Sequence, residues 1–155
     1  MAFDVQIVVD SARPHELADW WAEALGWPVE PQDEAFIQRM VDAGHASADD
    51  TVRHRGALVW RAGAALNSPD PGRPRLLFQS VPEGKTVKNR LHLDVRVGAE
   101  RREAEVARLL GLGATELWRD HFWKEFNGFN HAFSDPWRRV RSDIRTSTQG
   151  FTTHC

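Results

Sequence analysis

The clearest sign of the fold is the stretch Lys85-Thr-Val-Lys-Asn-Arg-Leu-His-Leu-Asp-Val-Arg-Val97, whose second half alternates between polar and apolar residues. Successive side chains of a β-strand point to opposite faces of a sheet, so this pattern predicts a strand with one face on the core. The other face presents His92 and Asp94 to a groove or to solvent. An earlier stretch, residues 3–10, has the same alternation with Gln6 in its polar set. We therefore expect two strands of similar design to carry the binding or the chemistry.

Composition and charge are those of one soluble domain. The chain has 155 residues, a net charge of -2 and interspersed acidic and basic residues, which argues against a surface that binds nucleic acid. The only cysteine, Cys155, ends a polar segment that we expect to be a flexible tail over residues 146–155. No apolar run is long enough for a signal peptide or a membrane helix. We therefore expect a cytoplasmic protein with no membrane or nucleic-acid partner.

The order of the elements repeats within a single domain expected over residues 1–145. In each half, a strand precedes an amphipathic helix that ends near a glycine, Gly26 in the first half and Gly113 in the second. Matching residues of two such halves meet in one cavity, although an ordinary α+β domain could have this order by chance. Module one is expected over residues 1–84, with strands 3–10, 56–61 and 75–81, helix 14–25 and a helical insertion 33–44. Module two is expected over residues 85–145, with strands 89–97, 114–119, 130–134 and 139–144 and helix 99–110.

Two segments resemble the openings of the two modules in the vicinal oxygen chelate (VOC) superfamily, in particular in its glyoxalase-like domain proteins. They are residues 85–97 and the segment Val5-Gln-Ile-Val-Val-Asp-Ser-Ala-Arg-Pro-His-Glu-Leu-Ala-Asp-Trp-Trp-Ala-Glu-Ala-Leu-Gly-Trp27. The resemblance extends to about residue 145. It implies an α+β fold of two βαβββ modules that form an incompletely closed mixed β cup around a small-molecule site, the glyoxalase/bleomycin resistance fold. It also implies a homodimer, because members of the superfamily commonly pair.

The resemblance also implies where a metal ion would bind. Enzymes of the family hold one divalent ion with a histidine or glutamine on the first strand of each module, and Gln6 and His92 match these positions. They add an acidic residue from a later strand of each module, where module one has Gln79 instead of a glutamate. In module two, ungapped counting reaches Ser142, a poor ligand, whereas a turn longer by one residue makes Asp143 the counterpart.

The charge of this ligand set argues against tight metal binding. Imidazole with oxygen ligands suits nickel, manganese or iron better than a closed structural zinc site. Only one carboxylate would neutralise the ion, and nearby arginines such as Arg139 and Arg141 would oppose it. We therefore expect no tightly bound metal, with one divalent ion (Ni, Mn, Fe or Zn) as the alternative. The chain has no glycine loop that could hold phosphates, so no nucleotide cofactor is expected.

His92 has two interpretations that the sequence leaves open. Beside a carboxylate it could act catalytically, as a general base near neutral pH. It could equally be a structural histidine that hydrogen-bonds across the sheet, for example to Asp94. Gln6 without a metal is a polar side chain that can donate to and accept from a ligand.

Aromatic residues give a second signal. The chain has seven tryptophans, eight phenylalanines and no tyrosine, and many of them lie between residues 118 and 137. They could form the core and a dimer contact, or they could line a cup that stacks on a flat apolar ligand. The candidate pocket residues are Trp60, Phe78, Asp94, His131, Phe133 and Trp137.

Three functions of different classes are consistent with these residues. The first, which we favour, is a module that binds a small apolar or aromatic molecule in the cup, like the drug-sequestering members that the resemblance implies. The second is a metal-dependent lyase, isomerase or dioxygenase-type enzyme that uses Gln6 and His92. The third is a structural or interaction domain with a filled cup. The sequence leaves open whether the protein catalyses a reaction.

Overall fold

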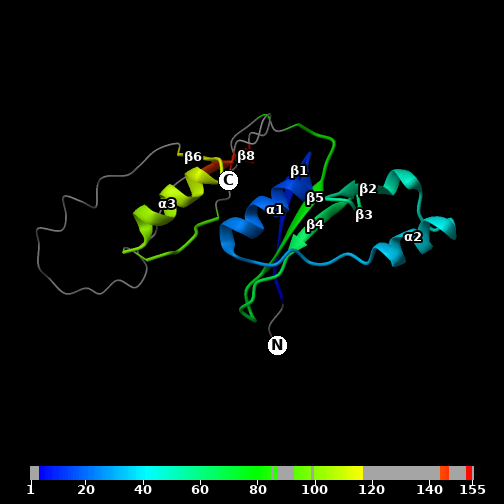
Figure 1. The fold of residues 1–155 in the computed structure, drawn as a ribbon, viewed down its shortest axis with the longest axis horizontal. Coiled ribbons are helices and arrows are strands. Elements are labelled where there is room, and N and C mark those ends of the chain that lie inside the picture. Colours follow the sequence, from blue (N-terminus) through cyan, green and yellow to red (C-terminus); the bar gives the residue numbers. More distant parts are fainter. Residues whose placement is uncertain are drawn as a thin grey trace, which may run out of the picture. The chain divides into compact units, whose positions relative to one another are not determined.

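The computed structural model describes residues 4–84, 86, 93–98, 100–116, 144–146 and 153–154 (Figure 1). The chain divides into two compact units, Met1–Gly84 and Lys85–Cys155. The division falls where the sequence places the boundary between the two modules, and the assignment of both modules to one domain stays a prediction. No helix within the described residues is both long and apolar enough to cross a membrane.

The first unit is built on a three-stranded sheet. Its strands are β1 (Gln6–Ser11), β4 (Gly63–Leu66) and β5 (Arg75–Ser80), in the order β1-β5-β4. Strand β5 runs parallel to β1 and antiparallel to β4. The strands expected over 3–10 and 75–81 are therefore confirmed in the described residues. Strand β4 is not among the expected elements, because its Gly-Ala-Ala-Leu sequence has neither alternation nor the β-branched residues that are typical of strands.

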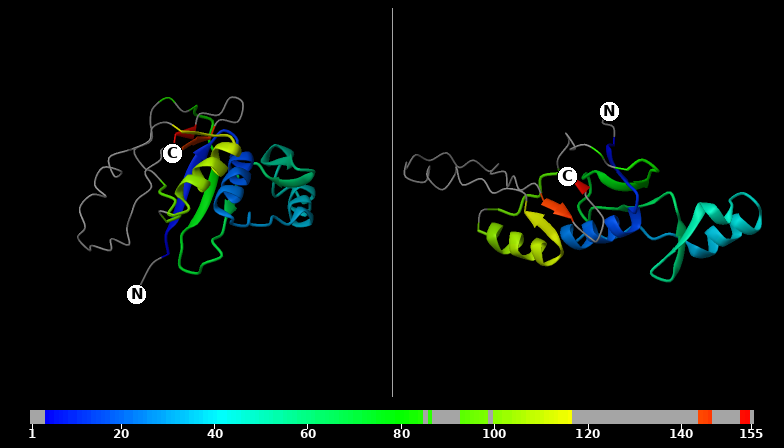
Figure 2. Two further views of the ribbon diagram at one scale, coloured as in Figure 1. Left: turned by 60° about the vertical axis from the view of Figure 1, so that its left-hand side comes forward. Right: turned by 90° about the horizontal axis from the view of Figure 1, so that it is seen from above.

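Helix α1 (Pro14–Leu25) follows β1 and covers one face of this sheet (Figure 2). Its bounds are those that the sequence predicts. Pro14 lies in the first turn, where a backbone N–H would have no acceptor within the helix, so proline costs no hydrogen bond there. Gly26 ends the helix with a φ of 66°. The buried apolar side chains of the helix are Leu17, Ala18, Trp21 and Ala24.

The two faces of the sheet differ in burial. Under α1, Leu66 and Phe78 are both 0% exposed. On the other face, the strand register places Gln6 opposite Arg75. Val8, two residues after Gln6 on the same face, is 46% exposed. Because successive residues of a strand alternate between faces, the core and the Gln6 side chain lie on opposite sides of the sheet.

Residues 31–62, which we call the insertion, leave the sheet after α1 and return to it at β4 (Figure 1). The insertion contains α2 (Glu34–Asp42), the 3-10 helix η1 (Ala48–Asp50), and an antiparallel hairpin of β2 (Thr51–His54) and β3 (Ala57–Trp60). The helix expected within 33–44 and the strand expected over 56–61 are confirmed. The insertion is longer than expected, because β2 pairs with β3 through the turn Arg55-Gly56. Both turn residues have positive φ, 49° and 87°, as a two-residue hairpin turn requires.

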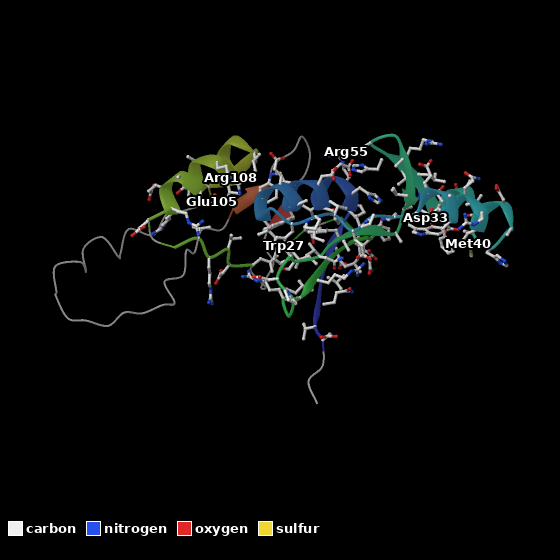
Figure 3. The ribbon with its side chains drawn as sticks, turned by 60° about the horizontal axis from the view of Figure 1, so that its bottom comes forward. Trp27, Asp33, Met40, Arg55, Glu105 and Arg108 are labelled. Atoms are coloured by element: carbon white, nitrogen blue, oxygen red, sulfur yellow. The ribbon has the colours of Figure 1, made fainter. Side chains whose placement is uncertain are left out.

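The second unit contains a helix and a small antiparallel sheet. The elements are α3 (Arg102–Gly111), β6 (Ala114–Glu116), β7 (Ile144–Thr146) and β8 (Thr153–His154), and the sheet order is β6-β7-β8. The helix expected over 99–110 and the beginning of the strand expected over 114–119 are confirmed. Glu105 and Arg108, one turn apart on α3, form a salt bridge (Figure 3).

Other expectations for the second half are corrected or lie outside the described residues. Residues 93–97, the described part of the strand expected over 89–97, are not in a strand, although exposed and half-buried residues still alternate there. The tail expected over 146–155 is not entirely irregular, because Thr153–His154 pairs with β7 and so satisfies backbone hydrogen bonds. The strand expected over 130–134 and residues 139–143 of the strand expected over 139–144 lie outside the described residues, and Ile144 begins β7. The α+β class is shown, and the two-module cup stays a prediction.

Candidate functional site

Gln6 and Gln79, two of the four residues considered as metal ligands, lie on the exposed face of the sheet in the first unit. They are not neighbours. Gln6 pairs with Arg75 in the register of β1 and β5, whereas Gln79 pairs with Asp10. Because a strand rises by about 3.3 Å per residue, the two glutamines are separated by roughly 13 Å along the strands. The structure therefore does not bring these two amides to one point.

The residue next to Gln6 is a cation. The Nη1 atom of Arg75 donates a hydrogen bond of 2.5 Å to Oε1 of Gln6. The same guanidinium binds Glu30, with 2.7 Å from Nε to Oε2 and 2.6 Å from Nη2 to Oε2. Arg75 is a site residue that the sequence analysis missed. Its position opposite Gln6 depends on the register of a parallel strand pair, which no local pattern reveals.

This donor set does not fit a divalent metal ion. The amide oxygen of Gln6 is the atom that would coordinate the ion, and it accepts a hydrogen bond from a guanidinium that would repel a cation. Within the described residues, no group of three or more His, Cys, Asp or Glu side chains could hold a metal. The other two ligand candidates, His92 and Asp143, lie outside the described residues.

Two of the expected pocket residues, Phe78 and Trp60, lie on different strands of the first unit. Phe78 belongs to the core under α1 and faces away from Gln6. Trp60 lies on β3 of the insertion, where its backbone N–H donates to Oε1 of Gln32 over 2.8 Å. Asp94 is an exposed residue of the second unit. The remaining candidates, His131, Phe133 and Trp137, lie outside the described residues.

The exposed face of the sheet has apolar side chains between polar ends. Val8 and the half-buried Leu77 lie in its middle. Gln6 and Arg75 lie at one end, and the pair of Asp10 and Gln79 lies at the other. Such a face can contact an apolar ligand while amide and carboxylate groups hydrogen-bond to polar atoms at its edges.

A second polar cluster, absent from the sequence analysis, joins α1 to the hairpin of β2 and β3. His15 and Asp19 come from α1, and His54 and Arg55 come from the hairpin. The Oδ2 atom of Asp19 accepts a hydrogen bond from Nε2 of His54 at 2.6 Å and forms an ion pair with Nε of Arg55 at 2.9 Å. Arg55 is labelled in Figure 3. The sequence signal is only partial, because the spacing of His15 and Asp19 places them on one helix face but does not identify their partners.

His15 is the buried member of this cluster. Its Nε2 atom donates to the backbone carbonyl of Trp60 at 3.0 Å, and its ring stacks on that of His54 with 5.1 Å between centroids. Burial lowers the pKa of His15 below its ordinary value, and the nearby His54 acts in the same direction. The Trp60 carbonyl and the carboxylates of Glu16 and Asp19 oppose this shift.

Comparison with known proteins places the chain in a family. No curated protein and no solved structure matches it. The model of the glyoxalase-like domain family matches residues 6–140, which is well over half of the 155 residues and begins at Gln6. The match agrees with the helix-covered sheet of the first unit and with the α+β content of both units. The protein therefore belongs to the glyoxalase-like domain family, which is part of the VOC superfamily.

Proposed function

We propose that this glyoxalase-like protein binds a small apolar or aromatic molecule on the exposed face of the β1-β5-β4 sheet, without a metal ion on Gln6. The observation that carries the proposal is the hydrogen bond from Arg75 to Gln6. This contact occupies the oxygen that a metal would need and puts a positive charge beside it. The exposed Val8 and the neighbouring Leu77 supply the apolar contact for a ligand.

Ligand binding to this face is tested with paired valine substitutions. A panel of planar apolar compounds is added to the full chain while tryptophan fluorescence and the melting temperature are recorded. Val8→Asp places a charge on the proposed face, and we expect it to weaken binding by at least about tenfold. The control is Val29→Asp, because Val29 is 37% exposed and pairs with Leu66, whose side chain is on the α1 side.

Two results would contradict this proposal. One is a Val8→Asp variant that binds the compounds as tightly as the unmodified protein does. The other is a complete lack of response to the panel, which would favour a structural or interaction domain. The homodimer, the cytoplasmic location and the role of Asp94 stay predictions.

The metal-dependent alternative, an enzyme that uses Gln6 and His92, has its own test. We expect protein purified without chelator to contain less than stoichiometric Ni, Mn, Fe or Zn, and Gln6→Ala to leave the metal content unchanged. Arg75→Glu places a carboxylate opposite Gln6, so it should bind these ions more tightly than Arg75→Gln, which only removes the charge. A stoichiometric ion that is lost in both Gln6→Ala and His92→Ala would establish the alternative.

A further inference from the structure

The insertion is a small substructure with little core of its own. In α2, only Ile37 is fully buried, and the hairpin of β2 and β3 has two strands. A two-stranded hairpin is marginally stable in water unless it packs on something else. The position of the insertion therefore depends on the contacts at its base, where it meets α1 and β4.

Several polar contacts are made there. Gln32 bridges the end of the hairpin to β4, because its Oε1 accepts from the Trp60 N–H and its Nε2 donates to the Gly63 carbonyl at 2.9 Å. On α1, His15 donates a hydrogen bond to the Trp60 carbonyl, and Asp19 accepts a hydrogen bond from His54 and forms an ion pair with Arg55. Hydrogen bonds and ion pairs of this kind depend on protonation, unlike apolar packing.

The two-residue turn of the hairpin carries one of the residues that contact Asp19. Arg55 has a φ of 49°, a left-handed conformation that is unfavourable for a residue with a Cβ atom. Its guanidinium is largely in solvent, and its Nε forms an ion pair with Asp19. The positive φ of Arg55 belongs to the two-residue turn, and this turn brings the guanidinium to Asp19.

The surroundings of His15 disfavour protonation of its ring. Asp19 accepts a hydrogen bond from His54 and is ion-paired with Arg55, so its single negative charge is already shared by two groups of the hairpin. Glu16, the other carboxylate on this part of α1, is paired with Arg13. A proton on His15 would therefore place a buried positive charge against the His54 ring, with Arg55 also nearby.

We propose that this cluster is a proton-dependent latch: the hairpin is docked on α1 while His15 is neutral, and it detaches when His15 takes up a proton. The latch is separate from the exposed face of the sheet and does not depend on the proposed ligand. Because the pKa of His15 is lowered in the docked state, the docked state is fully stabilised above the ordinary histidine value of 6.5. That stabilisation is lost as the pH falls from this value toward the lowered pKa.

The latch is tested by hydrogen exchange of the full chain at pH 7.5 and pH 5.5, with protection factors corrected for the intrinsic pH dependence of exchange. We expect the amides of β2 and β3 to lose protection at the lower pH, by up to about tenfold, because pH 5.5 lies one unit below the ordinary histidine pKa of 6.5. The amides of β5 should keep their protection. His15→Gln should abolish the pH dependence, because a glutamine can donate to the Trp60 carbonyl but takes up no proton.

The matched control is His45→Gln, a change at an exposed histidine of the same insertion, which should keep the pH dependence. A hairpin that responds to pH equally in His15→Gln and in the unmodified protein would overturn the proposal, as would unmodified protein whose hairpin does not respond. If His15→Gln does not fold, NMR titration of the unmodified protein decides the question. The hairpin amides must then shift with the midpoint of the His15 ring, and a shift that follows another histidine would also overturn the proposal.

Discussion

At Gly63, the first residue of β4, the backbone of β5 leaves no space for a Cβ atom. A Cβ atom at this position would lie 2.1 Å from the backbone oxygen of Phe78. Backbone atoms cannot move away as a flexible side chain can, so only glycine allows β4 to lie this close to β5. The Gly63 carbonyl also accepts the hydrogen bond from Gln32 that attaches the insertion.

We expect Gly63→Ala to lower the free energy of unfolding by about 1–3 kcal/mol, the usual cost of an overpacked position. Urea denaturation followed by tryptophan fluorescence measures this change. The control is Gly84→Ala, because a Cβ atom at Gly84 would meet nothing within 4 Å. Equal effects of the two substitutions would show that the close approach of β4 to β5 is absent.

Helix α2 begins with a side-chain cap. Asp33 precedes the helix, and its Oδ1 atom accepts a hydrogen bond of 3.0 Å from the Phe36 N–H. Aspartate is favoured at the position before the first helical residue, and the helical segment expected over 33–44 begins at this aspartate. The short helix, nine residues long, therefore depends on a bond that one carboxylate provides.

We expect Asp33→Ala to lower the stability of α2 by about 1 kcal/mol, because the N–H groups of the first turn lose their acceptor. Asp33→Asn should have little effect, since an asparagine oxygen accepts the same bond. Hydrogen exchange of the Phe36 amide reports the change directly. Similar exchange rates in the alanine and asparagine variants would contradict this role for the carboxylate.

The sheet of the first unit has a structural face, which packs under α1, and the proposed binding face on its other side. Among the described residues, Phe78 is the largest side chain with no exposed surface, and it lies on the α1 side. Val8 lies on the other side and contributes little burial. The stability of this unit and its proposed binding should therefore respond to different substitutions.

We expect Phe78→Ala to lower the free energy of unfolding by about 3–5 kcal/mol, which is typical of a large aromatic removed from a core. Val8→Ala should change it by less than about 0.5 kcal/mol, as expected of an exposed position. Denaturant melts of both variants give these values. A large loss of stability in Val8→Ala would mean that this face is packed rather than available to a ligand.

Local signals in the sequence account for the elements that were predicted. Pro14 and Gly26 mark the two ends of α1, and Asp33 marks the start of α2, because these residues have conformational preferences that act over a few neighbours. The alternation around Gln6 likewise indicates β1. The strand β4 was missed because its small residues carry no such preference.

The chain's amino acids alone indicated the α+β class and the polar face that carries Gln6, since periodicity and capping are local properties, and the resemblance of residues 5–27 and 85–97 indicated the family. Only the tertiary structure places Arg75 opposite Gln6 and stacks His15 on His54. These contacts join residues that are distant in the chain, and their pairing depends on strand register and on the path of the insertion. Register is set by the energy of the whole packed sheet, which no short pattern encodes.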